Sequence, residues 1–219
     1  MVESLPLLLA GVLTFVFGWN NSGILIGNER GSGTLSGLES TILCSVGMLL
    51  GVALEGSKTT GSLGGIVTAP PTDSMMLATL VASVLLTFGL TVARIPVTFS
   101  ATMVGAFAGA AFASSAVVRV GDVATIIAFW AIAPIATMAV TFLSYKAIQR
   151  ATANLSLLSV DAFNRAGVGL VSLALAFVLG ANNIGLIFGT SLAGSPPSST
   201  DAVLTLLALV AVAIAAMAL

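Results

Sequence analysis

One ten-residue pattern occurs twice in the chain, and each copy ends a long apolar run. The pattern is Gly-x-Asn-Asn-x-Gly-x-x-x-Gly, at residues 18–27 and 180–189. Adjacent amides inside hydrocarbon are costly, because each unpaired polar group there loses its hydration. Backbone that unwinds at membrane depth is tolerated only where it faces protein or a water-filled cavity. We therefore expect two breaks in membrane helices, and a pair in corresponding positions marks a transporter's binding site.

The amides and glycines of the two copies are the first candidate site residues. The amides are predicted to line a substrate site, and they are Asn20, Asn21, Asn182 and Asn183. The glycines are predicted to let the backbone unwind or a neighbour approach, and they are Gly18, Gly23, Gly27, Gly180, Gly185 and Gly189. The alternative is a pair of helix-packing faces, with glycine at the contact and asparagine bonding between helices. Recurrence of the whole pattern favours the binding site.

Composition places the chain in a bilayer. Of its 219 residues, 58% are hydrophobic and only 7% are charged, whereas soluble domains carry about 25% charged residues. The sequence predicts an all-α polytopic membrane protein whose partner is the lipid bilayer. A net charge of −1 without a basic cluster excludes a nucleic-acid partner.

Enzymatic and metal chemistry are also disfavoured by residue content. Cys44 is the only cysteine and histidine is absent, which excludes intrachain disulfides, cysteine metal cages and histidine proton relays. No nucleophile–base constellation is present, so we expect no enzyme and no cofactor.

About seven apolar segments follow one another along the chain. They are predicted near residues 5–26, 38–54, 75–93, 96–109, 123–143, 167–188 and 202–219. Residues 59–73 are rich in Gly, Thr and Pro and are expected to form a loop, with a partly re-entrant segment as an alternative. The expected organisation is a first transmembrane repeat at 1–145, a charged linker at 146–165 and the start of a second repeat at 166–219.

Basic residues indicate how the chain is oriented. One side of the predicted segments carries most of them: Arg30, Arg94, Lys146, Arg150 and Arg165. The other side carries only Lys58 and Arg119. By the positive-inside rule, the linker is cytoplasmic and the N-terminus is outside. We expect a multi-pass protein of the plasma membrane.

The two copies lie 162 residues apart, since Gly18 corresponds to Gly180 (180 − 18 = 162). An odd number of crossings between them would invert the second repeat, as in inverted-repeat transporters with broken helices. The second repeat is incomplete, because Leu219 corresponds to residue 57 of the first (219 − 162 = 57). We expect either a fragment with a missing C-terminal half or a short chain that completes its site as a homo-oligomer.

Hydroxyl side chains follow Pro96, where a helix is predicted to begin. Thr98 and Ser100 would lie near its N-terminus, which can bind an anion. The equally weighted alternative is an ordinary capped helix start, with Gly105 and Gly109 packing on a neighbour.

At these residues the sequence resembles the PiT family of inorganic phosphate transporters, which also includes sulfate permeases. Its repeated Gly-Ala-Asn-Asp-x-Ala-Asn-x-x-Gly-Thr is similar to residues 18–28 and 180–190. Its Pro-Val-Ser-Thr-Thr-His is similar to residues 96–101, and its Trp-x-x-Ser-Pro to residues 130–134. The resemblance implies that two inverted repeats carry phosphate with Na⁺ or H⁺ through one central site. It also implies that the four asparagines, Thr98 and Ser100 line that site.

The chain departs from the family at acidic and polar positions. Asn21 and Asn183 stand where the family has aspartate, Ala101 replaces its histidine, and Cys44 replaces a glutamate. Ile24 and Leu186 replace its later asparagines. Sodium prefers anionic or carbonyl oxygens, so these changes weaken a side-chain Na⁺ site. For an anion, exchanging aspartate for asparagine removes repulsion and adds donors.

We therefore expect a secondary transporter of inorganic phosphate or sulfate, with Na⁺ or H⁺ as the coupling ion. The alternative function is a non-transporting or truncated transporter half that serves as a membrane partner or scaffold.

Overall fold

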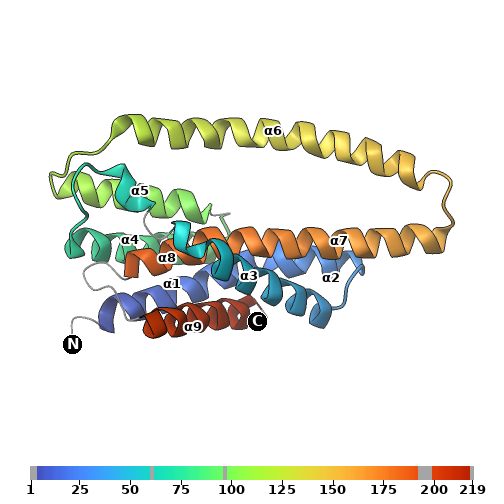
Figure 1. Ribbon diagram of the computed structural model, residues 1–219, viewed down its shortest axis with the longest axis horizontal. Helices are drawn as coiled ribbons and strands as arrows, with labels where there is room; N and C mark the ends of the chain where they lie inside the picture. Colours follow the sequence, from blue (N-terminus) through green and yellow to red (C-terminus); the bar gives the residue numbers. More distant parts are fainter. Residues whose placement is uncertain (1–3, 60–61, 96–97, 192–198, 218–219) are drawn as a thin grey trace.

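The computed structural model describes residues 4–59, 62–95, 98–191 and 199–217, which are almost entirely helical (Figure 1). Two long rods are each built from three consecutive helical pieces. The first comprises α1 (Ser4–Ser22), η1 (Gly23–Gly27) and α2 (Asn28–Ser32); the second comprises α7 (Leu157–Leu179), η3 (Gly180–Ile184) and α8 (Gly185–Ser191). The other helices are α3 (Gly37–Thr59), the short 3₁₀ turn η2 (Leu63–Ile66), α4 (Asp73–Val92), α5 (Phe99–Ala113), α6 (Val120–Thr152) and α9 (Ser199–Met217). Pro96, Val97 and Leu219 lie outside the described residues.

The predicted all-α membrane class is confirmed. Five helices of the described chain are long and apolar enough to cross a bilayer: Leu5–Ser32, Gly37–Gly56, Asp73–Val92, Val120–Thr152 and Leu157–Ser191. A span needs about 20 residues, because each residue of an α-helix adds about 1.5 Å. The shorter apolar helices are α5 and the 201–217 part of α9. Together, the five long spans and these two shorter helices of the described chain match the seven apolar segments expected from the sequence.

The two asparagine segments were expected to unwind, but both remain helical. In each rod the chain stays helical and passes through a π-helical stretch, η1 or η3. A π turn takes up an extra residue while the backbone stays hydrogen-bonded, which avoids exposing unpaired polar groups to hydrocarbon. The π turns also occupy different positions in the two repeats. Gly23, the first residue of η1, corresponds to residue 185 (23 + 162), whereas η3 begins at Gly180.

The charged linker expected at 146–165 is mostly helical. α6 continues to Thr152 and α7 begins at Leu157, so only a short turn joins them. The Ser156 hydroxyl caps α7 by accepting the backbone N–H of Ser159 at 3.3 Å. The expected loop at 59–73 contains η2, and an isolated antiparallel bridge joins Val67 to Val118.

Glycines bring the helices of the bundle into close contact. Gly18 of α1 lies against the Ala213 carbonyl of α9, and a Cβ at residue 18 would overlap that carbonyl. On the α3–α7 interface, Gly47 and Gly51 lie in the same way against the Leu173 and Phe177 carbonyls. Small residues allow backbones to approach and gain van der Waals contact where no hydrophobic force pairs helices.

The pairing of these helices is reciprocal between the two repeats. With the 162-residue offset, α1 corresponds to the α7 rod, and the first residue of α3, Gly37, corresponds to the first of α9, Ser199. α1 packs extensively on α9, and α7 packs extensively on α3. The first helix of each repeat therefore packs on the helix that follows the rod in the other repeat.

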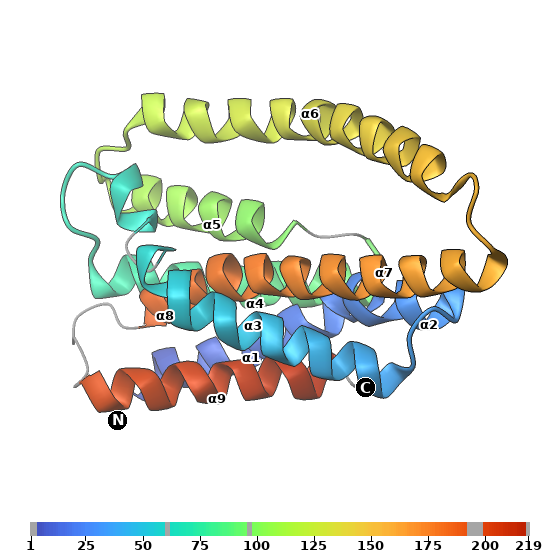
Figure 2. The ribbon, with the colours of Figure 1, turned by 45° about the vertical axis from the view of Figure 1, so that its right-hand side comes forward.

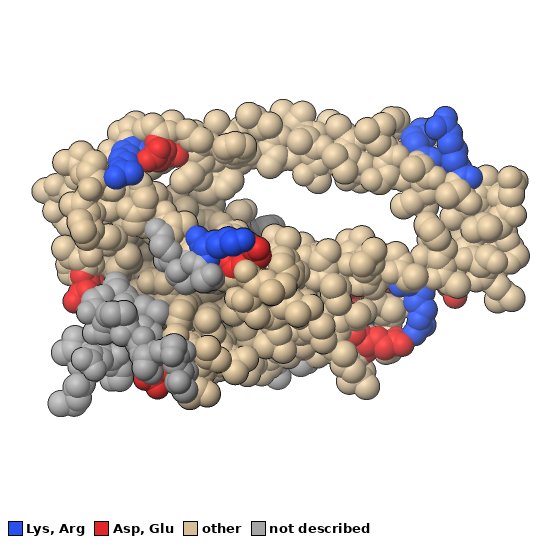
Figure 3. Space-filling view, viewed as in Figure 1, with Lys and Arg blue, Asp and Glu red and all other residues tan. Residues whose placement is uncertain are grey.

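α6 stands apart from this bundle. α4 packs against α1 and α5, whereas no residue of α6 is buried. In Figures 1 and 2, α6 runs along the upper edge, and α5 lies between it and the bundle at one end only. The space-filling view shows an opening through the molecule beneath α6 (Figure 3). Charged side chains in this view form small groups separated by wide uncharged surface.

The α2–α3 and α6–α7 connections lie at the same end of the molecule (Figure 1). There, Ser36 and Glu39 form a capping box: the Ser36 N–H donates to Glu39 Oε2 at 2.8 Å, and the Glu39 N–H donates to Ser36 Oγ at 3.3 Å. Arg165 of α7 forms an ion pair with the same carboxylate.

Candidate functional site

Three predicted site residues meet between the first turn of α5 and the π-helix η3. Asn182 Nδ2 donates to Ser100 Oγ at 3.1 Å, and Ser100 Oγ donates to Asn183 Oδ1 at 2.9 Å. Asn183 is only 4% exposed, whereas Asn182 is exposed. We call Ser100, Asn182 and Asn183 the Ser100 cluster. It joins the second asparagine copy to the hydroxyl segment that follows Pro96.

Aromatic packing fixes the α5 side of this cluster. Phe99, next to Ser100, is buried, and its ring meets that of Phe17 edge-on, with centroids 5.0 Å apart and planes inclined by 61°. Edge-to-face contact is a favoured geometry for aromatic pairs. It anchors the N-terminal turn of α5 on α1. The positive end of the α5 dipole therefore lies beside the two amides.

A hydroxyl of α3 fixes the η3 side of the cluster. Thr59 Oγ1 lies 2.8 Å from the Ala181 carbonyl oxygen and 2.9 Å from that of Gly56. Gly185, which begins α8, lies so close to Thr59 that a Cβ there would overlap the hydroxyl. The π-helix is thus held by the end of α3, and glycine at 185 permits the approach.

The other π-helix receives a comparable bond from the same helix. Cys44 Sγ of α3 lies 3.7 Å from the Leu25 carbonyl oxygen in η1, within the range of a weak S–H donor. One helix therefore bonds to a carbonyl of each π segment, through Cys44 near its start and Thr59 at its end.

The first asparagine copy makes different contacts from the second. Asn20 Nδ2 donates to Thr91 Oγ1 of α4 at 3.0 Å, and Asn21 Nδ2 donates back to the Phe17 carbonyl of its own helix at 2.9 Å. Asn20 bonds between helices, as the packing alternative expects. The structure does not join these two amides to the Ser100 cluster by a hydrogen bond among its described residues.

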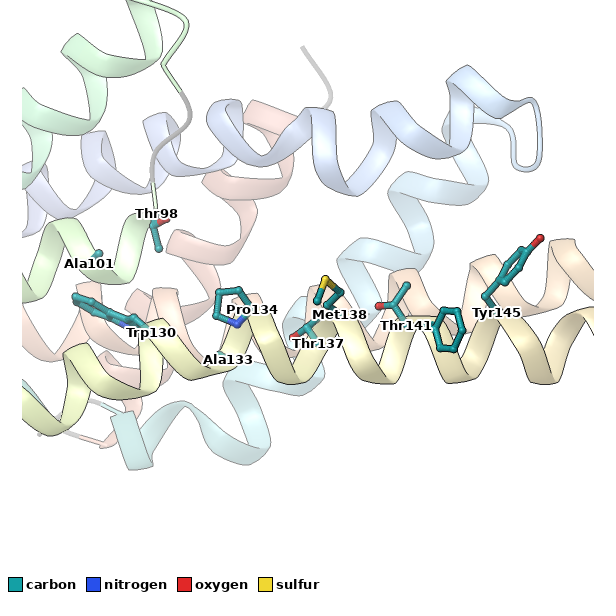
Figure 4. Close-up of a pocket in the computed structure, with 10 residues that line it drawn as sticks. Thr98, Ala101, Trp130, Ala133, Pro134, Thr137, Met138, Thr141 and Tyr145 are labelled. Atoms are coloured by element: carbon teal, nitrogen blue, oxygen red, sulfur yellow. The ribbon is translucent and has the colours of Figure 1, made fainter.

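Thr98 and Ser100 face different surroundings. Thr98 and Ala101 both line a cavity of 1020 Å³ between α5 and α6 (Figure 4). The α6 side is mainly apolar and includes Trp130, Pro134 and Met138, all aligned along one face of the helix (Figure 4). Of the two predicted hydroxyl donors, Ser100 meets the amides and Thr98 faces this cavity.

The predicted glycines divide into close contacts and open positions. Gly18, Gly180 and Gly185 each touch a neighbouring backbone or side chain, with Gly180 against the Met48 carbonyl. A Cβ at Gly23 would meet no atom within 4 Å, and one at Gly27 would meet only Ser22 O of its own segment, at 3.8 Å. The alternative in which Gly105 and Gly109 pack on a neighbour is wrong for the described structure, because a Cβ at either would meet nothing within 4 Å.

Sequence reasoning missed a row of hydroxyls on α4. Thr79, Ser83, Thr87 and Thr91 recur every four residues and so share one helix face. Ser83 and Thr87 are buried, and their hydroxyl oxygens have no hydrogen-bond partner among the described residues. The four-residue spacing was the signal that could have found them. The row continues to Thr91, the partner of Asn20.

No group of three or more acidic, cysteine or histidine side chains lies together in the described part of the chain. The Ser100 cluster itself contains neutral hydrogen-bonding groups, which suit an oxyanion better than a metal ion.

The chain matches the phosphate transporter family over residues 17–166, which is more than half of its length. The chain belongs to this family. Its members are transporters, so the match confirms the family expected from the sequence and agrees with the expectation that the chain is no enzyme. Comparisons with curated proteins and with solved structures find no significant match. Family and fold together make the chain a multi-pass membrane protein of a phosphate-transporting family.

Proposed function

We propose that the protein is a secondary transporter of a tetrahedral oxyanion, phosphate first and sulfate second, and that the Ser100 cluster binds the anion. The observation that carries this proposal is the hydrogen-bonded chain from Asn182 through Ser100 to Asn183. It joins two segments that the sequence separates by 82 residues. Both segments lie in the parts of the chain that resemble the family's motifs.

The donors of the cluster suit an anion. An asparagine amide has two N–H donors, and Asn182 uses one on Ser100. The exposed position of Asn182 leaves its second N–H accessible to a ligand. No carboxylate is part of the cluster, so an arriving oxyanion meets no repulsion from it. The N-terminal turn of α5 adds a favourable dipole.

Reciprocal packing of the helices supports an inverted repeat around this site. The contact of α1 with α9 corresponds to the contact of α7 with α3 when the two repeats are exchanged. A two-fold axis between the repeats requires this correspondence. In this proposal the Asn20 and Asn21 segment is the counterpart of the cluster, and the two segments alternate in facing the substrate. Gly18 and Gly180 permit the close crossings that let the repeats move as units.

Uptake into proteoliposomes tests the proposal. Purified full-length chain is reconstituted, and labelled phosphate uptake is measured with and without excess sulfate. Ser100→Ala is expected to lower uptake at least tenfold, because both amides lose their shared partner. Ser114→Ala, an exposed change at the other end of α5, is the matched control. Uptake unchanged in well-folded Ser100→Ala would remove the cluster from the anion path.

A non-transporting membrane partner remains the second candidate, and one observation favours it. α6 has no buried residue, and an opening lies beneath it (Figure 3). A helix of this length with no buried residue can also pack on another subunit, such as a second copy of the chain or another transporter subunit. Absence of uptake by the reconstituted chain alone, with uptake restored by a co-expressed transporter subunit, would favour this candidate.

A further inference from the structure

Glu29 is a buried acid at the end of the first membrane rod. It lies in α2 within the apolar span Leu5–Ser32, and it is 3% exposed. The acids at the ends of α3 are different: Glu39 and Glu55 have side chains 43% and 42% exposed, and each pairs with a cation. An ionisable side chain within a membrane span is costly and so suggests a function.

One oxygen of the carboxyl group is held and the other is not. Ser172 of α7 donates to Glu29 Oε1. Oε2 is buried and has no hydrogen-bond partner among the described residues. The backbone of Glu29 is fixed as well, since its carbonyl accepts Ser32 Oγ at 3.1 Å and the Thr34 N–H at 3.2 Å. These contacts fix the position of Glu29, and Oε2 has no hydrogen-bond partner among the described residues.

No cation of the described chain forms an ion pair with this carboxyl group. Arg30, its neighbour on α2, is exposed and lies beside Gly37, and Arg165 of α7 pairs with Glu39. From α3, the buried Cys44 thiol lies within electrostatic reach of Glu29. From α6, the side chain that borders the same space is the apolar Ile148.

Glu29 and Ser172 line a cavity of 510 Å³ between the first rod and the α6–α7 end of the molecule. Its other polar lining residues are Asn28, Ser32 and Asn164, and its remaining walls are mostly apolar, with Ile24, Phe163 and Val171 among them. The cavity therefore extends to the Glu29 side chain. The walls keep the local dielectric low, which penalises an unpaired carboxylate.

Two kinds of ligand could neutralise this carboxylate, a proton or a metal cation. Hard metal cations gather several oxygen ligands. Here a single hydroxyl bonds to the carboxyl group, and apolar side chains dominate the walls. A proton needs only the unpartnered oxygen. It also converts the buried group to its neutral form, which is far less costly to keep in an apolar environment.

We propose that Glu29, positioned by Ser172, is a proton-binding site inside the membrane. The proton reaches Oε2 through the cavity, binds there and is later released from the same carboxyl group. Glu29 therefore alternates between carboxylate and carboxylic acid. If the proposed anion transport holds, this acid is the site through which protons couple to it. Proton binding itself does not depend on the anion transported. Neither asparagine copy offers a carboxylate for that role, because Asn21 and Asn183 stand where the family has aspartate.

Carbodiimide labelling tests the proton site without any transport assay. Dicyclohexylcarbodiimide reacts with protonated carboxyl groups in apolar surroundings, and mass spectrometry locates the adduct. We expect an adduct on Glu29 of the purified full-length protein, with a yield that rises as the buffer becomes more acidic. Glu39 and Glu55 serve as internal controls and should stay unlabelled. No adduct on Glu29, a yield independent of pH, or suppression by sodium at constant pH would each overturn the proposal.

Transport measurements then separate this inference from the proposed function. Glu29→Gln keeps an acceptor for Ser172 and should fold, which size-exclusion chromatography checks. In proteoliposomes, an inward proton gradient should stimulate labelled phosphate uptake by wild type and by the control Glu55→Gln, and should give no stimulation in Glu29→Gln. Stimulation that persists in Glu29→Gln overturns the coupling role. Labelling of Glu29 without any phosphate uptake would instead reject the proposed function and leave the proton site standing.

Discussion

Gly18 of α1 lies against the backbone carbonyl of Ala213 in α9, and no side chain larger than hydrogen fits between them. In the second copy, Gly180 has the same relation to the Met48 carbonyl of α3. The two glycines open the two asparagine copies, so the pattern that predicted a binding site also sets two close helix crossings. Binding and packing are therefore functions of different residues within one motif.

The glycine pair Gly18 and Gly23 gives a matched test of this division. Gly18→Ala should lower the free energy of unfolding by about 1–3 kcal/mol, because its Cβ forces α1 away from α9. Gly23→Ala should be neutral or stabilising by up to about 1 kcal/mol, because its Cβ meets open space and alanine favours helix. Thermal unfolding in detergent measures both. Equal destabilisation by the two changes would contradict the close crossing.

The helical class, the apolar spans and the family could all be predicted from the sequence. Long uncharged runs have few folding options in a bilayer, and residues 17–166 match the family. The segment boundaries were less accurate because charged residues do not end a helix. α6 passes through Lys146 and Arg150 before it stops at Thr152.

The candidate site was predicted only in part, for a physical reason. The sequence indicates which residues are polar, but hydrogen-bond partners depend on how helices rotate against each other. Ser100 turns toward Asn183 while Thr98 faces α6, although only one residue lies between them along the chain. The π-helical backbone was also unforeseen, since a polar pair within a rod can be accommodated without unwinding. Glu29 lies between the polar residues Asn28 and Arg30, so its neighbours in the sequence do not indicate that it is buried.

Thr59 supports the second asparagine copy from outside the motif. Thr59→Val keeps the side-chain volume and removes the bond to the Ala181 carbonyl, so it should cost about 1 kcal/mol of stability. Because η3 carries Asn182 and Asn183, the change should also weaken phosphate binding more than it weakens folding. Thr125→Val is the control, since its hydroxyl bonds only to a carbonyl of its own exposed helix. Parallel thermal unfolding and phosphate titration of the two variants measure the difference.

Sodium dependence of uptake is expected to be weak or absent. Neither asparagine copy supplies a carboxylate, and the described chain holds no cluster of acidic, cysteine or histidine side chains for a metal ion. Labelled phosphate uptake into proteoliposomes is compared in sodium and in potassium buffers at equal pH. Similar rates in the two buffers are the expected result. A strong sodium requirement that survives Asn21→Ala would place a cation site elsewhere in the fold.

The asparagines at equivalent positions of the two copies, Asn20 and Asn182, are expected to differ in function. The sequence predicts that both matter more to anion binding than Asn21 and Asn183, because the family keeps asparagine at those positions. The structure adds a distinction between them. Asn182 is exposed and bonds to Ser100, whereas Asn20 is part-buried and bonds to Thr91 on another helix.

Asn182→Ala should therefore lower phosphate affinity about tenfold or more, as expected for loss of a hydrogen bond to a charged group worth about 1.5–3 kcal/mol. Asn20→Ala should lower thermal stability by about 0.6 kcal/mol, the average for a hydrogen bond between membrane helices, with a smaller effect on affinity. Calorimetric titration of both purified variants with phosphate and with sulfate, after size exclusion confirms folding, measures these effects. Unchanged affinity in folded Asn182→Ala, from a wild type that binds, would show that this amide serves helix packing and that the anion binds elsewhere.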